Sequence, residues 1–218
     1  MRDLTTIRTA LDLSYSAIEA LTVELSEDDW ATPSLCPGWT GRDVVLHLAS
    51  IEQVLAGWLP GNGEEPPDFA RAGHLAAETA TLDNLTFGRR VREVFSQRRS
   101  DLAELDGTDL ARASWTPIGP ATYGRFLELR VFDFWVHERD ITTPLGRPTD
   151  NRGLRAEMTL DEVEGSLGYI VGKKVGLPDG RSIAFHLAGP LERDLYVVVD
   201  GRAKVVQHLE HPDCRAHD

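Results

Sequence analysis

The chain has few cysteines, few lysines and no long apolar run among its 218 residues. Only Cys36 and Cys214 occur, far apart, which favours two free thiols in a reducing compartment over a disulfide framework. No stretch approaches the roughly 20 apolar residues of a transmembrane helix. The opening, MRDLTTIRTALDLSY, lacks the apolar core of a secretory signal. These absences predict a cytoplasmic protein.

Positive charge is also scarce. Against 35 acidic residues there are 23 basic ones, which gives a formal net charge of -12 at pH 7. Binding to phosphate backbones or to anionic membrane surfaces needs a basic face, so nucleic acid and membranes are not expected as partners. Only three of the basic residues are lysines. This bias is typical of a GC-rich bacterial genome.

Apolar residues recur with a helical period through the first two thirds of the chain. The pattern predicts long amphipathic helices over residues 3–26, 40–59, 74–106 and 121–143. Thr40 is the expected N-cap of the second helix, with Asp43 completing a capping box, and Pro60 closes that segment. Four such helices joined by loops rich in proline and glycine predict a four-helix bundle.

A change of composition at residues 144–153, PLGRPTDNRG, predicts a linker between two domains. We expect the bundle to occupy residues 1–150 and a small α+β domain to occupy residues 154–218. The fold class is therefore mixed, α followed by α/β. About 65 residues make a marginal core for an independent domain, so this part either continues in a longer protein or leans on the bundle.

The small domain is predicted to contain one helix and three strands. Thr159 and Glu162 have the spacing of a capping box, and the helix should end near Lys174 and Gly176. The segments SIAFHLAG and DLYVVVDGRAKVV have strand composition. The second is expected to form a hairpin that turns at Asp200-Gly201.

The stretch RVFDFWVHERDI places Asp133 and His137 four residues apart in an apolar helix. Residues at this spacing share one helix face. Three interpretations fit: a buried hydrogen-bonded pair, a general-base dyad, or two ligands of one metal ion.

A third metal ligand must come from another helix, and His47 in DVVLHLAS is the histidine that lies within an apolar stretch of a second bundle helix. Two histidines and one carboxylate leave a coordination position open, as in catalytic metal sites. The alternative is that each residue is simply a core side chain whose polar atoms are hydrogen-bonded within the protein.

Two further polar residues share this region of the helix. Arg130, one turn before Asp133, is a candidate for binding a substrate carboxylate, or it pairs with a nearby acid. Asp140, three residues after His137, is a candidate to orient the imidazole from a second shell, or it lies at a solvated helix end.

Apolar side chains nearby are weaker candidates. Trp135 and Trp39 are candidates to line a substrate pocket, although core packing is the default for tryptophan. Cys36 lies in LCPGW, where a small apolar residue that packs a loop is the better interpretation.

Three segments, residues 33–50, 129–141 and 164–180, together resemble the mycothiol-dependent maleylpyruvate isomerase family, whose bundle belongs to the DinB-like superfamily. The resemblance implies a metal-binding four-helix bundle, a small α+β domain, a divalent metal, usually zinc, and the thiol mycothiol. It places the metal ligands at His47, Asp133 and His137. The best-known isomerase has Glu at the position of Asp133, and the C-terminal domain of the family normally runs past the end of this chain.

The activity implied by this resemblance is that of an isomerase or thiol transferase. A metal-bound thiolate would attack a small electrophilic substrate, and the protein would be a monomer or homodimer. Two alternatives stay open: a non-catalytic module that binds a metal or thiol for regulation, and a metal-dependent hydrolase in which the open position activates water.

Overall fold

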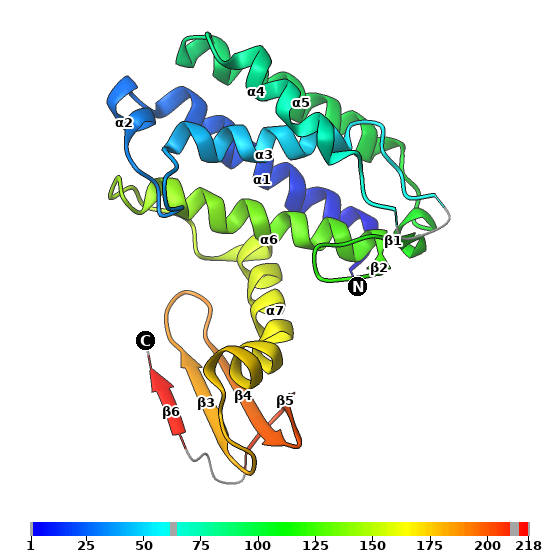
Figure 1. Cartoon of the computed structure of the whole chain (residues 1–218), viewed down its shortest axis with the longest axis vertical. Helices are drawn as coiled ribbons and strands as arrows, with labels where there is room; N and C mark the ends of the chain where they lie inside the picture. Colours follow the sequence, from blue (N-terminus) through cyan, green and yellow to red (C-terminus); the bar gives the residue numbers. More distant parts are fainter. Residues whose placement is uncertain (1, 62–64, 210–213, 218) are drawn as a thin grey trace. The chain divides into compact units, whose positions relative to one another are not determined.

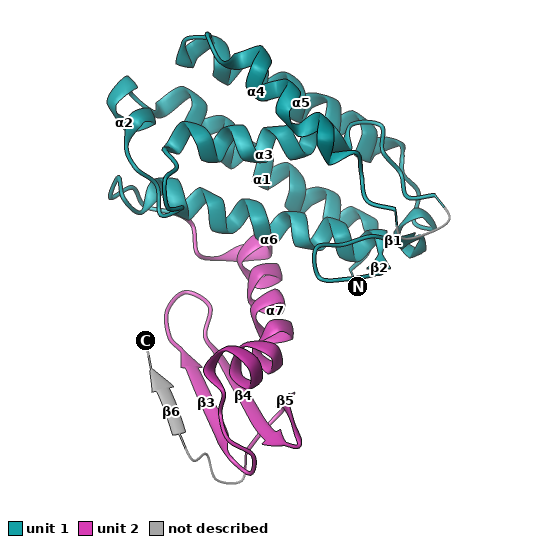
Figure 2. Cartoon of the chain, viewed as in Figure 1, with its two compact units in different colours: residues 1–149 teal, residues 150–218 magenta. Residues whose placement is uncertain are grey.

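The computed structural model describes residues 2–61, 65–209 and 214–217, the last four by their backbone only. The chain forms two compact units, residues 1–149 and residues 150–218 (Figure 2). Within the described parts, every helix is too short or too polar to span a bilayer.

Unit 1 is the predicted four-helix bundle, which confirms the fold class (Figure 1). Helix α1 packs against α5 and α6, and α3 packs against α5 and α6 as well. The long helices are α1 (Leu4–Glu24), α3 (Gly41–Leu55), α5 (Asn84–Glu104) and α6 (Tyr123–Thr142). Shorter elements are α2 (Glu27–Ala31), α4 (Ala72–Thr79), two 3-10 turns (Phe69–Arg71 and Asp109–Ala111) and the antiparallel pair β1 (Ala113–Ser114) and β2 (Ala121–Thr122).

Helix α3, which carries one of the site residues, begins where the sequence predicts. The Thr40 hydroxyl accepts from the Asp43 backbone N–H at 3.3 Å, and the Asp43 carboxylate accepts from the Thr40 N–H at 2.8 Å. The capping box satisfies two backbone donors that the first helical turn leaves without partners. The helix ends earlier than predicted, at Leu55.

The single helix predicted over residues 74–106 is wrong, because the structure divides it into α4 and α5. Asp83 lies between them in an extended conformation, and its carboxylate accepts from the Thr86 N–H at 2.7 Å. Aspartate favours such an N-cap over a helix interior, so its local hydrogen bond outweighs the apolar period. Helix α2, capped by Ser26 and Asp29, was not predicted.

An aromatic cluster occupies the centre of the bundle. Tyr15 of α1 stacks on Phe95 of α5 with ring centroids 5.0 Å apart, and Phe134 of α6 packs edge-on against both, at 5.3 and 5.6 Å. All three side chains are fully buried. Phe134 thus fixes the rotation of α6 about its axis and turns the face of Asp133 and His137 away from this cluster.

The close approach of α1 and α5 depends on Gly88. A Cβ atom at this position would lie 2.9 Å from Thr22 Cβ and 3.2 Å from the Thr22 carbonyl oxygen. We expect Gly88→Ala to lower the free energy of unfolding by about 1–3 kcal/mol, because the helices must separate. The control is Gly73→Ala in α4, where nothing lies within 4 Å and alanine should stabilise the helix by about 0.5–1 kcal/mol. Equal effects in chemical denaturation would contradict this explanation.

Unit 2 is a small α+β unit, which agrees with the predicted class. Helix α7 (Gly153–Tyr169) continues as a π-helix (Ile170–Val175) and packs on β5 and β4. The strands β3 (Ser182–Leu187), β4 (Arg193–Asp200), β5 (Arg202–Val206) and β6 (Cys214–His217) form a sheet in the order β5-β4-β3-β6, antiparallel except for β6, which runs parallel to β3.

Two details of this unit differ from the prediction. Thr159 is not an N-cap, because α7 begins six residues earlier and buries Thr159 to 2% exposure. The residues 154–158, Leu-Arg-Ala-Glu-Met, are all good helix formers, which explains the earlier start. The sheet also has a fourth strand, β6, where three were predicted. The hairpin at Asp200-Gly201 is confirmed, with Gly201 at a φ of 63°.

Candidate metal centre

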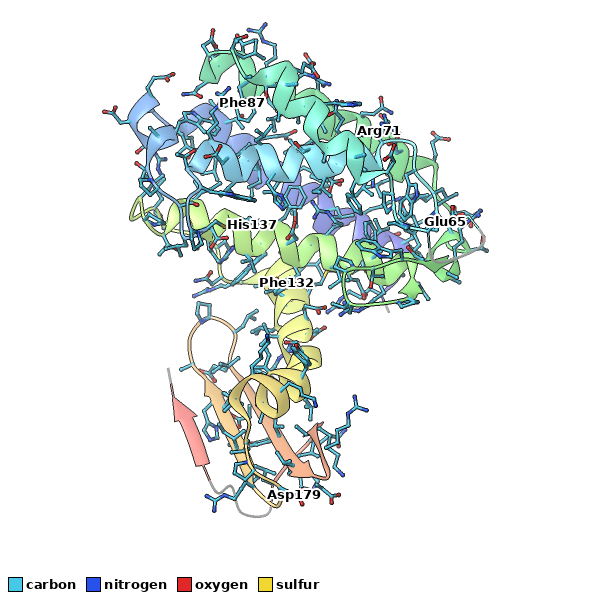
Figure 3. All side chains as sticks on the ribbon, viewed as in Figure 1. Glu65, Arg71, Phe87, Phe132, His137 and Asp179 are labelled. Carbon is cyan, nitrogen blue, oxygen red and sulfur yellow. The ribbon has the colours of Figure 1, made fainter. Side chains whose placement is uncertain are left out.

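Helices α3 and α6 bring together the three residues that the sequence nominates as metal ligands. Asp133 Oδ1 lies 3.5 Å from His137 Nε2, and Asp133 Oδ2 lies 4.0 Å from His47 Nε2. One donor atom from each of the three residues lies within 4.8 Å of the other two. Figure 3 shows His137 on the side of α6 that faces α3, with Phe132 on the opposite side.

The group is half-buried. The side chains of His47 and Asp133 are 32% and 31% exposed, and that of His137 is 16% exposed. The two imidazoles meet edge to face with centroids 5.1 Å apart, and the centroid of the Trp39 ring lies 5.2 Å from that of His47. The group is therefore accessible to a small molecule while Trp39, rather than solvent, covers part of it.

The protonation of His47 suits a metal ligand. Burial lowers the pKa of His47 below its ordinary value of 6.5, and Asp133 opposes that shift only in part. The imidazole is therefore neutral at pH 7 and offers a lone pair, which is the form that binds a metal ion.

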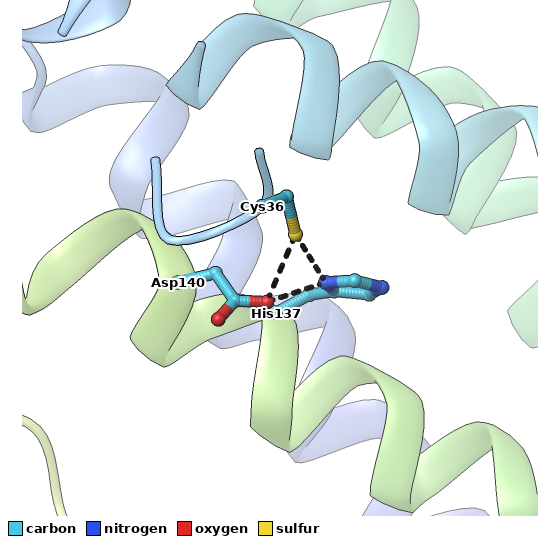
Figure 4. A group of neighbouring side chains, drawn as sticks. All are labelled: Cys36, His137 and Asp140. Atoms are coloured by element: carbon cyan, nitrogen blue, oxygen red, sulfur yellow. Dashed lines mark hydrogen bonds and ion pairs between the residues drawn. The ribbon is translucent and has the colours of Figure 1, made fainter. Parts of the chain in front are cut away.

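The second ring nitrogen of His137 is engaged by Asp140 (Figure 4). Nδ1 lies 2.8 Å from Asp140 Oδ2, which also accepts from the Cys36 thiol at 3.2 Å. A proton on Nδ1, donated to Asp140, leaves the lone pair on Nε2, the atom that faces Asp133. A carboxylate in this position is the usual partner of a metal-binding histidine.

Cys36 contacts His137 and Asp140, although the sequence indicates only a residue that packs a loop. Its Sγ lies 3.7 Å from His137 Nδ1, and Cys36, His137 and Asp140 form a second set of neighbouring donor atoms. No periodic pattern links a loop residue to a helix 101 positions later, so this contact had no signal in the sequence. Cys36 is a free cysteine, and the side chain of Cys214 lies outside the described residues.

The environment of Cys36 makes its thiol a poor nucleophile. Burial and the hydrogen bond to Asp140 raise the pKa of Cys36 to about 11 from its ordinary value of 9.0. A pKa about two pH units higher means about 100-fold less thiolate at neutral pH. In a Cys214→Ser background without metal, we expect alkylation of Cys36 by iodoacetamide to be about 100-fold slower than that of a model thiol at pH 7.5, and to accelerate as the pH rises. Alkylation at the model rate would contradict this environment.

Arg130 is buried, with only 8% exposure, and is held from both sides. Its Nη1 donates to Asp133 Oδ2 at 2.5 Å, and its Nε donates to Glu52 Oε1 at 3.0 Å. Glu52 Oε2 accepts from Arg98 Nε and from the Tyr15 hydroxyl, each at 2.9 Å. An ionic network thus runs from Arg98 of α5 to Asp133 of α6.

Glu52 and Arg98 were not predicted to belong to the site. Glu52 is 1% exposed, and a signal for it exists, since it falls on the apolar stripe of α3 between Leu48 and Leu55. Burial alone would raise the pKa of Glu52, but Arg130 and Arg98 lower it below its ordinary value, so the carboxylate is ionised.

Trp135 lies outside this group of side chains. Residues two apart on a helix do not share a face, and the Trp135 ring lies under the Arg139 guanidinium at 3.3 Å. Trp39 is instead the tryptophan whose ring contacts one of the two histidines, His47.

The three donors fit a divalent cation. Two neutral imidazoles and one carboxylate form the ligand set of catalytic zinc sites, which keep a further position open for water or substrate. Because the side chains of His47 and Asp133 are 32% and 31% exposed, a small molecule can reach a cation held between the three donors.

Comparison with known proteins agrees with this architecture. No curated protein matches the sequence. Two crystal structures of mycothiol-dependent maleylpyruvate isomerase, one of them of a histidine-to-alanine mutant, are 17% identical and superpose with TM-scores of 0.63 and 0.65 over 92% of this chain and 82% of theirs. YfiT from Bacillus subtilis, a probable metal-dependent hydrolase with an unusual four-helix bundle topology, is 20% identical and gives a TM-score of 0.50 over 66% of this chain and 89% of its own.

At such identities these likenesses show the fold alone. The sequence itself carries the assignment: the family model for the mycothiol maleylpyruvate isomerase N-terminal domain matches residues 11–142, a range that holds all three candidate ligands. The chain therefore belongs to the mycothiol maleylpyruvate isomerase family.

Proposed function

We propose that the chain is a metal-dependent isomerase or thiol transferase that uses mycothiol and acts on a small electrophilic substrate. His47, Asp133 and His137 are the proposed ligands of one divalent cation, with zinc as the first choice. We assign this centre to a bundle domain of residues 1–150, followed by a separate α+β domain of residues 154–218. The observation that carries the proposal is the convergence of these three donors within 4.8 Å in a chain of this family.

A cation bound here supplies positive charge that stabilises the thiolate form of a low-molecular-weight thiol. The side chains prepare the site for it. His47 is neutral because of its burial, and Asp140 holds the ring of His137 with Nε2 turned to the centre. Asp133 provides the one negative charge among the three ligands. The partial exposure of His47 and Asp133 leaves a path for the thiol.

Such a thiolate would add to an electrophilic carbon of the substrate. In an isomerase, addition to a conjugated cis double bond would permit rotation about the resulting single bond before the thiol leaves, and in a transferase the adduct would be the product. We retain Arg130 and Trp135 as candidates for contacting the substrate, because Arg130 Nη2 and Trp135 Nε1 are both buried donors without a hydrogen-bond partner in the described structure.

The proposal is tested by metal content and thiol dependence together. Purified protein should hold about one divalent ion per chain, and turnover of a conjugated electrophile such as a cis-enone acid should require added mycothiol. His47→Ala should lose both properties, while the matched control His186→Ala, which alters a histidine paired with Asp194 in unit 2, should keep them. Protein that binds no metal, or a His47→Ala variant with unchanged metal content and turnover, contradicts the proposal.

A hydrolase is the second candidate, and its support is the fold likeness to YfiT. In that case the open position would activate water. Turnover of an ester or amide without thiol would favour this function. Metal binding without turnover of any thiol, electrophile or ester would favour a regulatory module.

A further inference from the structure

The two carboxylate oxygens of Asp133 have different surroundings. Oδ2 accepts the 2.5 Å hydrogen bond from Arg130 Nη1 and lies 4.0 Å from His47 Nε2, whereas Oδ1 lies 3.5 Å from His137 Nε2. A charge-assisted bond of this length holds its oxygen firmly. The guanidinium therefore fixes the rotation of the carboxylate, with Oδ1 turned to His137 and Oδ2 turned to His47.

Arg130 cannot turn away from Asp133 without leaving a second bond. Its Nε is bound to Glu52 Oε1 at 3.0 Å, and its guanidinium lies 5.2 Å from the Phe134 ring centroid. With the side chain more than nine-tenths buried, water cannot replace either carboxylate partner at low cost. The planar fork thus fixes where Nη1 points.

Glu52 is itself held in place by hydrogen bonds on the oxygen that does not bind Arg130. Its second oxygen accepts from Arg98 and Tyr15, and Arg98 Nη1 donates to the Leu55 carbonyl at 3.0 Å. Arg98 is 1% exposed. Helices α1, α3 and α5 therefore all contribute to the position of one guanidinium on α6.

From this geometry we infer that Arg130 is a positioning residue for Asp133: its bond to Oδ2 fixes the rotation of the carboxylate, so that Asp133 keeps its oxygens turned to the two histidines. Glu52 and Arg98 hold Arg130 in that orientation. The inference deepens the proposed function and rests on it, since it concerns how the same three ligands bind a cation. A carboxylate released from Arg130 would be free to rotate away from the two histidines.

The test separates positioning from charge by using lysine. Arg130→Lys keeps the positive charge, but a single ammonium cannot bridge Glu52 and Asp133 as a planar fork does. We expect this variant to bind Zn²⁺ about 10- to 100-fold more weakly in competition with a chromophoric chelator, the range found for partners of metal ligands. The visible spectrum of the Co²⁺-loaded variant should also change, because Asp133 binds differently.

Two variants complete the design. Arg99→Lys is the matched control: Arg99 pairs with Asp12 and Glu19 at the surface of α5, and this variant should bind Zn²⁺ like the wild type. Arg98→Lys touches none of the three ligands and should shift Zn²⁺ affinity and the Co²⁺ spectrum in the same direction as Arg130→Lys, by a smaller factor. It also serves as the second variant if Arg130→Lys fails to fold.

The outcomes are distinguishable. If wild-type protein binds Zn²⁺ and Arg130→Lys or, failing that, Arg98→Lys matches it within threefold with an identical Co²⁺ spectrum, the positioning role is wrong and the proposed function stands. If wild-type protein binds neither ion, the proposed function fails, and the positioning role fails with it.

Discussion

Glu52→Gln is expected to lower the free energy of unfolding of the bundle by about 3–5 kcal/mol, the range for removing one partner of a buried ion pair. The carboxylate is 1% exposed and is the shared partner of Arg98 and Arg130. The neutral amide removes the negative charge that Arg98 and Arg130 share, so two buried guanidinium groups lose an ionic partner. Chemical denaturation followed by circular dichroism measures the loss.

The control for this prediction is Glu78→Gln. Glu78 pairs with Arg90 at the surface, and exposed pairs contribute only about 0–1 kcal/mol. If Glu52→Gln and Glu78→Gln destabilise the protein equally, Glu52 does not hold a buried network. Replacing Glu52, Arg98 and Arg130 together with apolar residues should restore most of the stability, because no buried charge then lacks a partner.

The same network predicts a pH dependence. The folded state lowers the pKa of Glu52, so folding is linked to its ionised form. The contribution is therefore complete above the ordinary pKa of glutamate and declines as the pH falls through the lower folded value. Wild-type protein should lose stability faster than Glu52→Gln in acid, and parallel curves would contradict this linkage.

His137→Ala is expected to abolish metal binding and to reduce kcat/KM by at least ~10³-fold, or about 4 kcal/mol of transition-state stabilisation. The substitution removes one of three proposed ligands and also leaves Asp133 Oδ1 and Asp140 without their imidazole partner. Metal analysis and steady-state kinetics with saturating mycothiol measure the two effects.

The matched control for His137→Ala is His74→Ala, because His74 is an exposed histidine of α4 in the same unit. It should retain full metal content and activity. A His137→Ala protein that keeps its metal, or that loses activity only through unfolding, would show that the metal centre has been assigned to the wrong residues.

Part of the site was predictable because its signals are local. The i, i+4 spacing of Asp133 and His137 survives in the helix, and the capping box of Thr40 and Asp43 sets the start of α3. His47 stood out as a polar residue in an apolar helical stretch. These patterns depend on periodicity and on hydrogen bonds within one turn, which a sequence contains directly.

The rest depends on contacts between distant segments. Arg98 meets Glu52 across 46 positions, and Cys36 meets His137 across 101. Such pairs arise from how α3, α5 and α6 rotate against the aromatic cluster, and no local pattern encodes that rotation. The break between α4 and α5 has a local cause. The apolar period predicts one continuous helix, but the N-cap hydrogen bond of Asp83 starts a new helix at Asn84.

The most direct test of the metal centre is a titration of Co²⁺-loaded protein with mycothiol, followed by electronic absorption. If His47, Asp133 and His137 hold the ion with one position open, the thiol should produce a sulfur-to-cobalt charge-transfer band in the near ultraviolet that saturates at one equivalent. His47→Ala should give no such band. A spectrum that mycothiol leaves unchanged, in protein shown to hold Co²⁺, would contradict the proposed role of the centre.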